Sequence, residues 1–254
     1  MIKAVFLDID NTLLDFDAYV KDSMKVGFEK YGLKKYEDWM FPIFQEINHE
    51  MWGRLEQGTL SYQELLKIRW NKVFEALGIS FDGWEFEQFF KDYLFDSAIP
   101  VEGAMELLEY LKGKYVICAA SNGPYEQQVN RLTKGGMIGY FDYLFISERI
   151  GVAKPSKLFF ETAIRELNQK GSVRENVTRK NLENESPEQK SLEEGNQILP
   201  EEILIIGDSL TSDMTGGIDS GLKTCLFDWK CGGDTKGLPI DYVVHTLKEI
   251  QEIL

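Results

Sequence analysis

The sequence predicts an α/β fold: a doubly wound parallel sheet with an inserted all-helical domain. Short apolar runs alternate with helical segments along most of the chain, which is the pattern of consecutive β–α–β units. Most of these runs are continuously apolar, as expected for strands that are buried on both faces of a parallel sheet. Residues 16–97 differ, because they show helical periodicity and contain no convincing strand.

Six apolar runs are the predicted strands, and helical segments lie between and after them. The strands are Lys3–Asp8, Val116–Ala120, Tyr143–Ile146, Ile203–Gly207, Thr224–Phe227 and Tyr242–Val244. The predicted helices outside residues 16–97 are Glu102–Lys112, Tyr125–Gly135, Lys157–Asn168, Asp213–Gly221 and Leu247–Leu254. Ligands of such sheets bind beyond the carboxyl ends of the strands, so we expect the chemistry at that edge.

The inserted span carries its own helix signals. Apolar residues recur there at intervals of three or four, in the set Phe41, Phe44, Ile47, Met51 and Leu55. Ser61 and Glu64 form a predicted capping box at the start of the next helix, and Gly78 is a stop signal at its end. We therefore expect a core made of residues 1–15 and 98–254 and a helical domain made of residues 16–97. Within the core, residues 169–200 are polar and mixed in charge, which predicts a surface insertion.

Composition narrows the function classes. The net charge is −14, which argues against non-specific binding to nucleic acid or to anionic membranes. The three cysteines have no zinc-site spacing, and the two histidines are far apart, so acid–base chemistry is expected of carboxylates. A strand at the start of the chain predicts no signal peptide, and no apolar run is long enough to cross a bilayer. Two of the cysteines fall in apolar strands, which predicts a reducing, cytoplasmic location.

Two carboxylates follow the first predicted strand. Asp8 and Asp10 stand two residues apart where that strand gives way to a loop, so both can point into one crevice. Like charges this close repel unless a cation or a shared proton relieves them, and catalysis is a common reason to keep such a pair. The alternative is a strand end capped by acidic turn residues.

Four motifs together favour the catalytic interpretation. In chain order they are Asp8-Ile9-Asp10-Asn11-Thr12, Ser121-Asn122-Gly123, Lys154-Pro155 and Gly207-Asp208-Ser209-Leu210-Thr211-Ser212-Asp213. This set resembles the motifs of the haloacid dehalogenase superfamily of hydrolases, and the resemblance covers the whole core. It implies a Rossmann-like core with an inserted helical cap domain. Taken singly, each motif also has an ordinary explanation: a turn, a solvated surface lysine or a helix cap.

The resemblance implies a role for each matched residue. Asp8 would be the nucleophile that forms an aspartyl-phosphate, and Asp10 the general acid and then the general base. Ser121, Asn122 and Lys154 would bind the phosphoryl oxygens. The metal would be Mg²⁺, held by Asp8, by the backbone carbonyl of Asp10, by Asp208, and by Asp213 directly or through water. Because the dehalogenase branch lacks an aspartate at the place of Asp10, the resemblance is to the phosphatase and phosphomutase branch.

A finer resemblance points to the substrate. Leu13-Leu14-Asp15-Phe16-Asp17, Ile47-Asn48 with Trp52, and Ser121-Asn122-Gly123 with Gln127 look like nucleoside 5′-monophosphate phosphatases that prefer pyrimidines. Asn48 and Trp52 stand four apart, hence on one helical face, and we expect them to help select the leaving group. The alternative for Trp52 is burial among the Phe and Leu side chains of the helical domain.

The leading hypothesis is therefore a Mg²⁺-dependent phosphomonoesterase acting on nucleoside 5′-monophosphates. The alternatives are a phosphatase for phosphoglycolate or a sugar phosphate, a phosphomutase, and a non-catalytic module on the same fold. The expected partner is a small phosphorylated metabolite, with no nucleic acid and no membrane, and the expected state is a monomer or homodimer.

Overall fold

The computed structural model describes residues 1–169 and 197–254. Contacts between residues divide the chain into two units, one made of Met1–Leu14 with Pro100–Leu254 and the other of Asp15–Ile99. These limits lie within two residues of the expected limits of the core and the helical domain. The larger is called the core unit and the smaller the helical unit.

The core unit is built on a parallel sheet whose strand order is β3-β2-β1-β4-β5-β6. The strands are β1 (Ala4–Leu7), β2 (Val116–Ser121), β3 (Tyr143–Ile146), β4 (Ile203–Gly207), β5 (Lys223–Phe227) and β6 (Tyr242–Val244). All neighbouring strands pair in parallel, which confirms the predicted fold class. The first strand is central: β1 lies between β2 and β4, so the chain reverses its direction of winding on either side of it.

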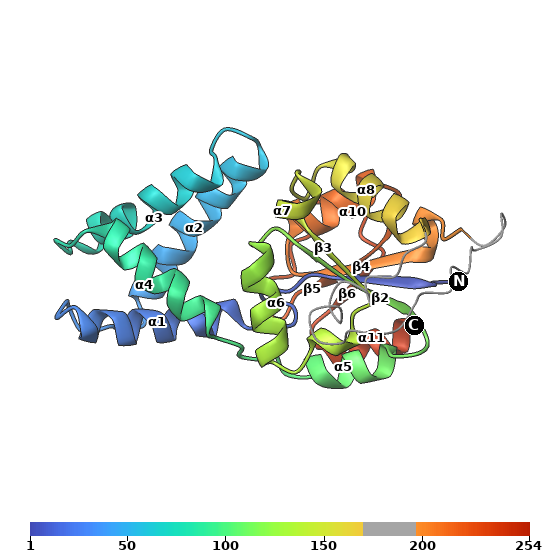
Figure 1. Ribbon diagram of the computed structural model, residues 1–254, viewed down its shortest axis with the longest axis horizontal. Helices are drawn as coiled ribbons and strands as arrows, with labels where there is room; N and C mark the ends of the chain where they lie inside the picture. Colours follow the sequence, from blue (N-terminus) through green and yellow to red (C-terminus); the bar gives the residue numbers. More distant parts are fainter. Residues whose placement is uncertain (170–196) are drawn as a thin grey trace, which may run out of the picture. The chain divides into compact units, whose positions relative to one another are not determined.

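Helices cover both faces of this sheet, with α8 and α10 over one face and α5 and α11 over the other (Figure 1). The longer elements are α5 (Ala104–Leu111), α6 (Tyr125–Lys134) and α8 (Lys157–Asn168). The shorter ones are η1 (Ile138–Tyr140), α7 (Ser147–Ile150), η2 (Pro200–Glu202), α10 (Gly216–Asp219), η4 (Leu247–Glu249) and α11 (Ile250–Ile253). Pro155 stands before the N-cap residue Ser156 and outside the helix that follows.

One predicted helix differs from the observed element. The segment expected as a helix over Asp213–Gly221 begins earlier, with a π-helical turn, η3 (Leu210–Thr215), followed by α10. Ser209 caps this turn, because its side chain accepts a hydrogen bond from the backbone N–H of Ser212. The wider π turn has a different residue period from an α-helix, so the sequence periodicity placed its start too late.

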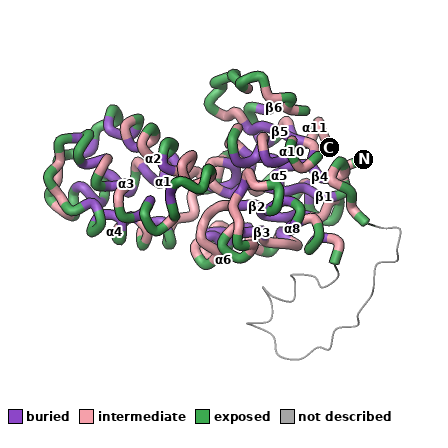
Figure 2. The backbone as a smooth tube through the Cα atoms, turned by 90° about the horizontal axis from the view of Figure 1, so that it is seen from above, coloured by how far each residue is buried: buried purple, intermediate pink, exposed green. Residues whose placement is uncertain are grey.

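Burial of the strands explains their apolar sequences. The residues of β1 and β4 are all buried, whereas the edge strand β6 is largely exposed, as the colours in Figure 2 show. Cys118 in β2 and Cys225 in β5 are buried free thiols of this core, as expected. No helix in the described ranges is both long and apolar enough to cross a lipid bilayer.

The predicted polar insertion, 169–200, falls mostly outside the described residues. Asn168 and Ile198, which flank the range that is not described, are joined by two hydrogen bonds. The amide of Asn168 donates to the carbonyl of Ile198 and accepts from its N–H, at 2.9 and 2.8 Å.

The helical unit consists of α1 (Phe16–Lys30), α2 (Met40–Glu56), α3 (Tyr62–Leu77) and α4 (Gly83–Phe95). The predicted capping box is present: Ser61 accepts from the N–H of Glu64, and the Glu64 side chain accepts from the N–H of Ser61. Gly78 ends α3 with φ of 61°, a left-handed conformation that glycine adopts without a Cβ penalty. The core of this unit is aromatic and centres on Trp70, whose ring centroid lies 4.4 Å from that of Phe86.

A charged pair is buried in the same unit. Arg69 donates two hydrogen bonds to Glu87, at 3.1 and 2.7 Å, and both side chains are at least 95% buried. The Arg69 guanidinium also lies over the ring of Phe90, 4.8 Å from its centroid. Burial raises the pKa of Glu87, and the charge of Arg69 acts in the opposite direction. Arg69 therefore stabilises the ionised form of this carboxylate inside the apolar core.

Candidate active site

The strand order brings three of the sequence motifs to one place. Asp8 follows β1, Ser121 ends β2 and Asp208 follows β4, and β1 is hydrogen-bonded to both other strands. The backbone N–H of Asp8 continues the ladder by donating to the carbonyl of Ile206 at 2.9 Å. In a parallel sheet the carboxyl ends of adjacent strands meet at one edge, so the motifs converge where ligands of this fold bind.

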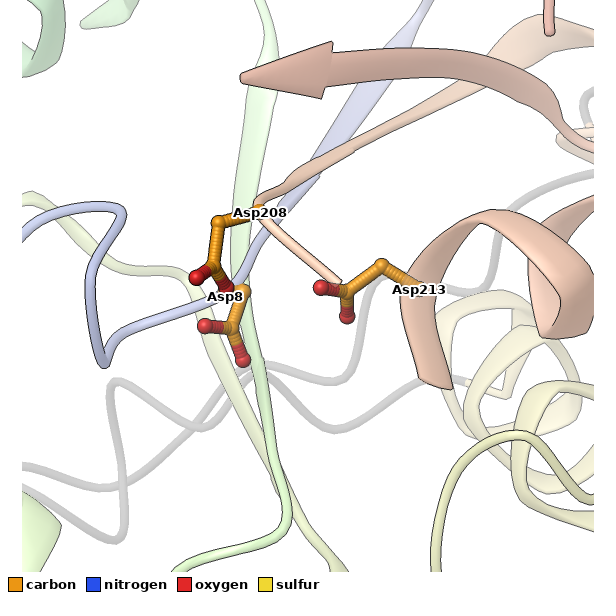
Figure 3. Close-up of side chains that lie close together, drawn as sticks. All are labelled: Asp8, Asp208 and Asp213. Carbon is orange, nitrogen blue, oxygen red and sulfur yellow. The ribbon is translucent and has the colours of Figure 1, made fainter. Parts of the chain in front are cut away.

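Three carboxylates form a cluster at this edge. Asp8, Asp208 and Asp213 each offer an oxygen, and these oxygens lie within 4.8 Å of one another. Figure 3 shows the Asp8 and Asp208 carboxyl groups side by side, with the carboxyl group of Asp213 directed toward them. The side chains come from the segments that follow β1 and β4 and from η3.

Lys154 connects two of these carboxylates. Its Nζ donates to Oδ1 of Asp8 at 2.7 Å, to Oδ1 of Asp213 at 2.6 Å and to the carbonyl of Ala120 at 2.6 Å. All three ammonium hydrogens are therefore used, and the side chain is only 1% exposed. Within this group a single buried cation faces three carboxylates, so negative charge is in excess.

The excess charge is reflected in the titration of the cluster. Burial raises the pKa of Asp8 to about 7, and the neighbouring charges of Asp213 and Asp10 act in the same direction against Lys154. Burial, followed by the charges of Asp8 and Asp213, also raises the pKa of Asp208. For Lys154, burial alone would lower the pKa, but the Asp213 and Asp8 carboxylates raise it above its ordinary value.

The local sequence allows the Asp213 carboxylate to be buried at the end of β4. Its Oδ2 accepts from the backbone N–H of Ser209 at 3.1 Å, while Oδ1 is held by Lys154. A Cβ on Gly207 would lie 2.1 Å from Oδ2 of Asp213, so a residue with a side chain does not fit there. The glycine that ends β4 thus permits a fully buried carboxylate to approach the end of the strand.

Asp10 lies in a tight loop after β1. Asn11 in this loop has φ of 60°, and its N–H donates to the carbonyl of Leu14 at 2.7 Å. The Asp10 carboxylate accepts from Arg131 through Oδ1 at 2.6 Å and from Gln128 through Oδ2 at 2.8 Å. Its side chain is therefore paired with α6 and lies outside the three-carboxylate cluster.

Ser121 and Asn122 connect the carboxyl end of β2 with α6 and with the segment that carries Lys154. The Ser121 hydroxyl oxygen accepts from the N–H of Gly123 at 3.1 Å and from Gln128 at 2.9 Å. The Asn122 side chain is fixed to the backbone of Lys154 by two hydrogen bonds, at 2.9 and 2.8 Å. The amide of Asn122 thus positions the lysine segment, and its backbone N–H is the expected phosphate donor.

Two residues of this site carry no motif in the sequence. Gln128 and Arg131 were not expected there, and the glutamine quoted in the resemblance was its neighbour, Gln127. Gln128 is fully buried and contacts both Ser121 and Asp10, whereas Gln127 is partly exposed. The available signal was the spacing of three between Gln128 and Arg131, which places both on one face of α6.

The two expected selectivity residues belong to the helical unit. Oδ1 of Asn48 accepts from Nη1 of Arg69 at 2.9 Å, so the amide is oriented by the buried charged pair. Trp52 is half-buried and packs against Tyr62, with 6.2 Å between ring centroids, in an apolar cluster around Met51 and Leu65. These contacts fit the packing alternative for Trp52, and its role toward a ligand stays a prediction.

The core unit thus combines a parallel α/β sheet with a buried lysine–carboxylate group at the carboxyl ends of its strands. Residues 2–221 match the haloacid dehalogenase-like hydrolase family. The chain belongs to this family of hydrolases, as its motifs predicted.

Individual relatives agree with this assignment. The chain is 30% identical over 233 residues to pyrimidine 5′-nucleotidase PynA of Streptococcus pneumoniae, with 89% of this chain and 84% of that protein covered. It is 27% identical over 251 residues to pyrimidine 5′-nucleotidase YjjG of Escherichia coli, with 98% and 96% covered. Among solved structures, HAD-hydrolase YfnB of Bacillus subtilis bound to magnesium matches with a TM-score of 0.81, 25% identity and coverage of 100% and 98%.

Proposed function

We propose that this protein is a Mg²⁺-dependent phosphomonoesterase that forms an aspartyl-phosphate on Asp8 and acts on nucleoside 5′-monophosphates. The observation that carries the proposal is the contact between the buried Lys154 and Oδ1 of Asp8, which orients the Asp8 carboxylate. The chain belongs to a family of hydrolases, in which such a carboxylate is the expected nucleophile. Oδ2 of Asp8 accepts no hydrogen bond from the described residues, so it is available to attack phosphorus.

The first half-reaction uses Asp8 and Asp10. A carboxylate oxygen of Asp8 forms a bond to phosphorus while the bond from phosphorus to the ester oxygen breaks. Asp10 donates a proton to that departing oxygen, so the product leaves as an alcohol. Asp10 follows Asp8 by two residues, and Gln128 links its carboxylate to Ser121, which supports a role for Asp10 close to the bound phosphate.

The second half-reaction returns the enzyme to its starting state. Asp10, now ionised, takes a proton from a water molecule as the water oxygen forms a bond to phosphorus. The bond from phosphorus to Asp8 breaks, and inorganic phosphate leaves. In both steps the transferred group carries negative charge that fixed donors must stabilise, and we assign this task to Lys154, the Ser121 hydroxyl and the backbone N–H of Asn122.

The acidic cluster fits a divalent cation. Its donors are carboxylate oxygens within 4.8 Å of one another, which suits a hard cation such as Mg²⁺. Burial and the neighbouring carboxylates raise the pKa of both Asp8 and Asp208, and a bound cation would favour their ionised forms. Asp8, Asp208 and Asp213 would hold the ion, together with the Asp10 carbonyl. When bound, it would neutralise charge on the incoming phosphoryl group.

The substrate class rests on the relatives and on the helical unit. Two relatives that cover most of the chain are named pyrimidine 5′-nucleotidases, which supports a small phosphorylated substrate with a nucleoside as its leaving group. We assign recognition of that nucleoside to Asn48 and Trp52. Because Arg69 donates to Oδ1 of Asn48, the amide NH₂ of Asn48 is the end left to donate to a ligand.

A phosphate-release screen tests the proposal. Purified protein with added Mg²⁺ is incubated with pyrimidine and purine nucleoside monophosphates, sugar phosphates and phosphoglycolate. We expect the highest kcat/KM for a pyrimidine nucleoside 5′-monophosphate. A higher kcat/KM for phosphoglycolate or a sugar phosphate would show that this compound, and not a nucleotide, is the substrate class. Interconversion of hexose phosphates would indicate a mutase. No phosphate release from any ester would reject the phosphatase.

A further inference from the structure

Helix α6 supplies two buried polar side chains that the reaction described above does not use. Gln128 is fully buried and Arg131 is 1% exposed, although both are polar residues that need hydrogen-bond partners in such a position. Both contact Asp10, and Gln128 also contacts Ser121, at the distances given above. The helix therefore connects the expected acid–base residue with the expected phosphate donor.

The orientation of the Gln128 amide follows from Arg131. A guanidinium group has only donors, so the atom that lies 3.1 Å from Nη1 of Arg131 must be the acceptor Oε1 of Gln128. This leaves Nε2 as the atom that faces Ser121 and Asp10, to which it donates its two hydrogens at 2.9 and 2.8 Å. Arg131 thus decides which way the amide points.

The Ser121 hydroxyl is oriented in turn. Its oxygen has two lone pairs, and both accept: one from the N–H of Gly123 and one from Nε2 of Gln128. The hydroxyl hydrogen is consequently left to be donated elsewhere, as binding to a phosphoryl oxygen requires. Room for this arrangement is provided by Gly123, where a Cβ would lie 2.4 Å from Nε2 of Gln128.

The Asp10 carboxylate is held in the same way. Gln128 and Arg131 each occupy one of its oxygens, which fixes the plane of the carboxyl group. Each oxygen keeps a second lone pair at which a proton can be carried toward the leaving group.

We propose that Gln128 and Arg131 are positioning residues, which orient the Ser121 hydroxyl as a donor to phosphate and aim the Asp10 carboxyl group at the leaving-group oxygen. This inference rests on the proposed function. It assigns the pair no contact with the reacting atoms, since both act through Ser121 and Asp10.

The test compares two substrates that differ in their need for a proton. With added Mg²⁺, kcat and KM are measured for phenyl phosphate and for p-nitrophenyl phosphate. The p-nitrophenolate group departs readily without protonation, whereas phenolate needs the proton more. We expect Gln128→Met and Arg131→Met to lower kcat/KM for phenyl phosphate by about 10–100-fold, the range seen when groups that orient the ligands of a metal site are removed. The loss on p-nitrophenyl phosphate should be smaller. The ratio between the two substrates does not depend on how much of a variant is folded.

Two controls complete the design. Gln127→Met places the same substitution one position away on α6 and should keep both values close to wild type. In an Asp10→Asn background, Arg131→Met should cost less than it does alone, because residues that act through one another are not additive. Variants with the wild-type substrate ratio and wild-type kcat would overturn the inference and leave the proposed function intact. A wild-type protein that hydrolyses neither ester would overturn both.

Discussion

Nζ of Lys154 lies 2.7 Å from Oδ1 of Asp8, although the two residues are 146 positions apart in the chain. Both side chains are buried, and the same ammonium group also binds Asp213. A lysine in this position lowers the electrostatic repulsion between two carboxylates that the fold brings together. It therefore serves both the stability of the core unit and the orientation of the expected nucleophile.

Replacing Lys154 should destabilise the protein strongly. In Lys154→Met the carboxylates of Asp8 and Asp213 lose their buried cation, and breaking a buried pair of this kind costs about 3–5 kcal/mol. Urea unfolding measures the loss. Lys157→Met is the matched control, because Lys157 and its partner Glu161 are 63% and 55% exposed and should contribute less than about 1 kcal/mol. Equal losses in the two variants would show that the buried pair contributes little.

Gly207→Ala should displace Asp213. The added methyl group would lie 2.1 Å from Oδ2 of Asp213, which Lys154 and Ser209 hold in place, so the carboxylate must move. We expect a loss of about 1–3 kcal/mol in stability, typical of overpacking, together with weaker Mg²⁺ binding in calorimetry. Gly53→Ala is the control, since a Cβ at Gly53 in α2 meets no atom within 4 Å. Unchanged Mg²⁺ affinity in Gly207→Ala would argue against Asp213 as a ligand.

The acidic cluster predicts that rising pH lowers the stability of the metal-free protein and raises its affinity for Mg²⁺. Because the pKa of Asp8 is raised from 3.8 to about 7, the folded state holds this proton more tightly than the unfolded state. The stability from this group is complete below 3.8 and is lost as the pH rises through about 7, so the metal-free protein should melt at a lower temperature near pH 8 than near pH 5.

Binding of Mg²⁺ should run the other way. The ligands must be deprotonated, so the affinity should fall about tenfold per pH unit below the pKa of Asp8. Thermal melts in chelator and calorimetric titrations across this range measure the two effects. Asp8→Asn should weaken both dependences, and an Mg²⁺ affinity that does not change between about pH 5 and pH 8 would contradict the proposed site.

The helical unit should decide the choice of substrate. If Trp52 contacts the nucleoside, Trp52→Ala should lower kcat/KM for nucleoside monophosphates more than for phosphates without a base, by about 10-fold if one stacked base is lost. Trp84→Ala is the control, because Trp84 is a 40% exposed tryptophan in the same unit. A uniform loss over all substrates in Trp52→Ala would favour a packing role against Tyr62.

The strands and long helices of this chain were predictable because local signals determine them. Continuous apolar runs indicated the buried strands, and Ser61, Glu64 and Gly78 marked the ends of α3 through their own hydrogen bonds and backbone angles. The order of the four motifs also indicated which residues meet at the edge of the sheet. Each of these features depends on residues that are close in sequence or on the general geometry of parallel sheets.

Other features required the structure. Gln127 and Gln128 are chemically identical, and only the exact phase of α6 decides which of them is buried against Ser121. The start of η3 was misplaced because a π turn shifts the period that marks a helix. Arg131 pairs with Asp10 across 121 positions, and because Arg131 stands outside the four motifs, no motif indicated this contact.

The central claim is that Asp8 carries the phosphoryl group during turnover. The most direct measurement is acid quenching during turnover with Mg²⁺ and substrate, followed by mass spectrometry of the peptide that contains Asp8. The account predicts a phosphoryl group on Asp8, more abundant in Asp10→Asn, and no turnover in Asp8→Asn. Wild-type turnover in Asp8→Asn, with no phosphorylated peptide in the active wild-type enzyme, would contradict it.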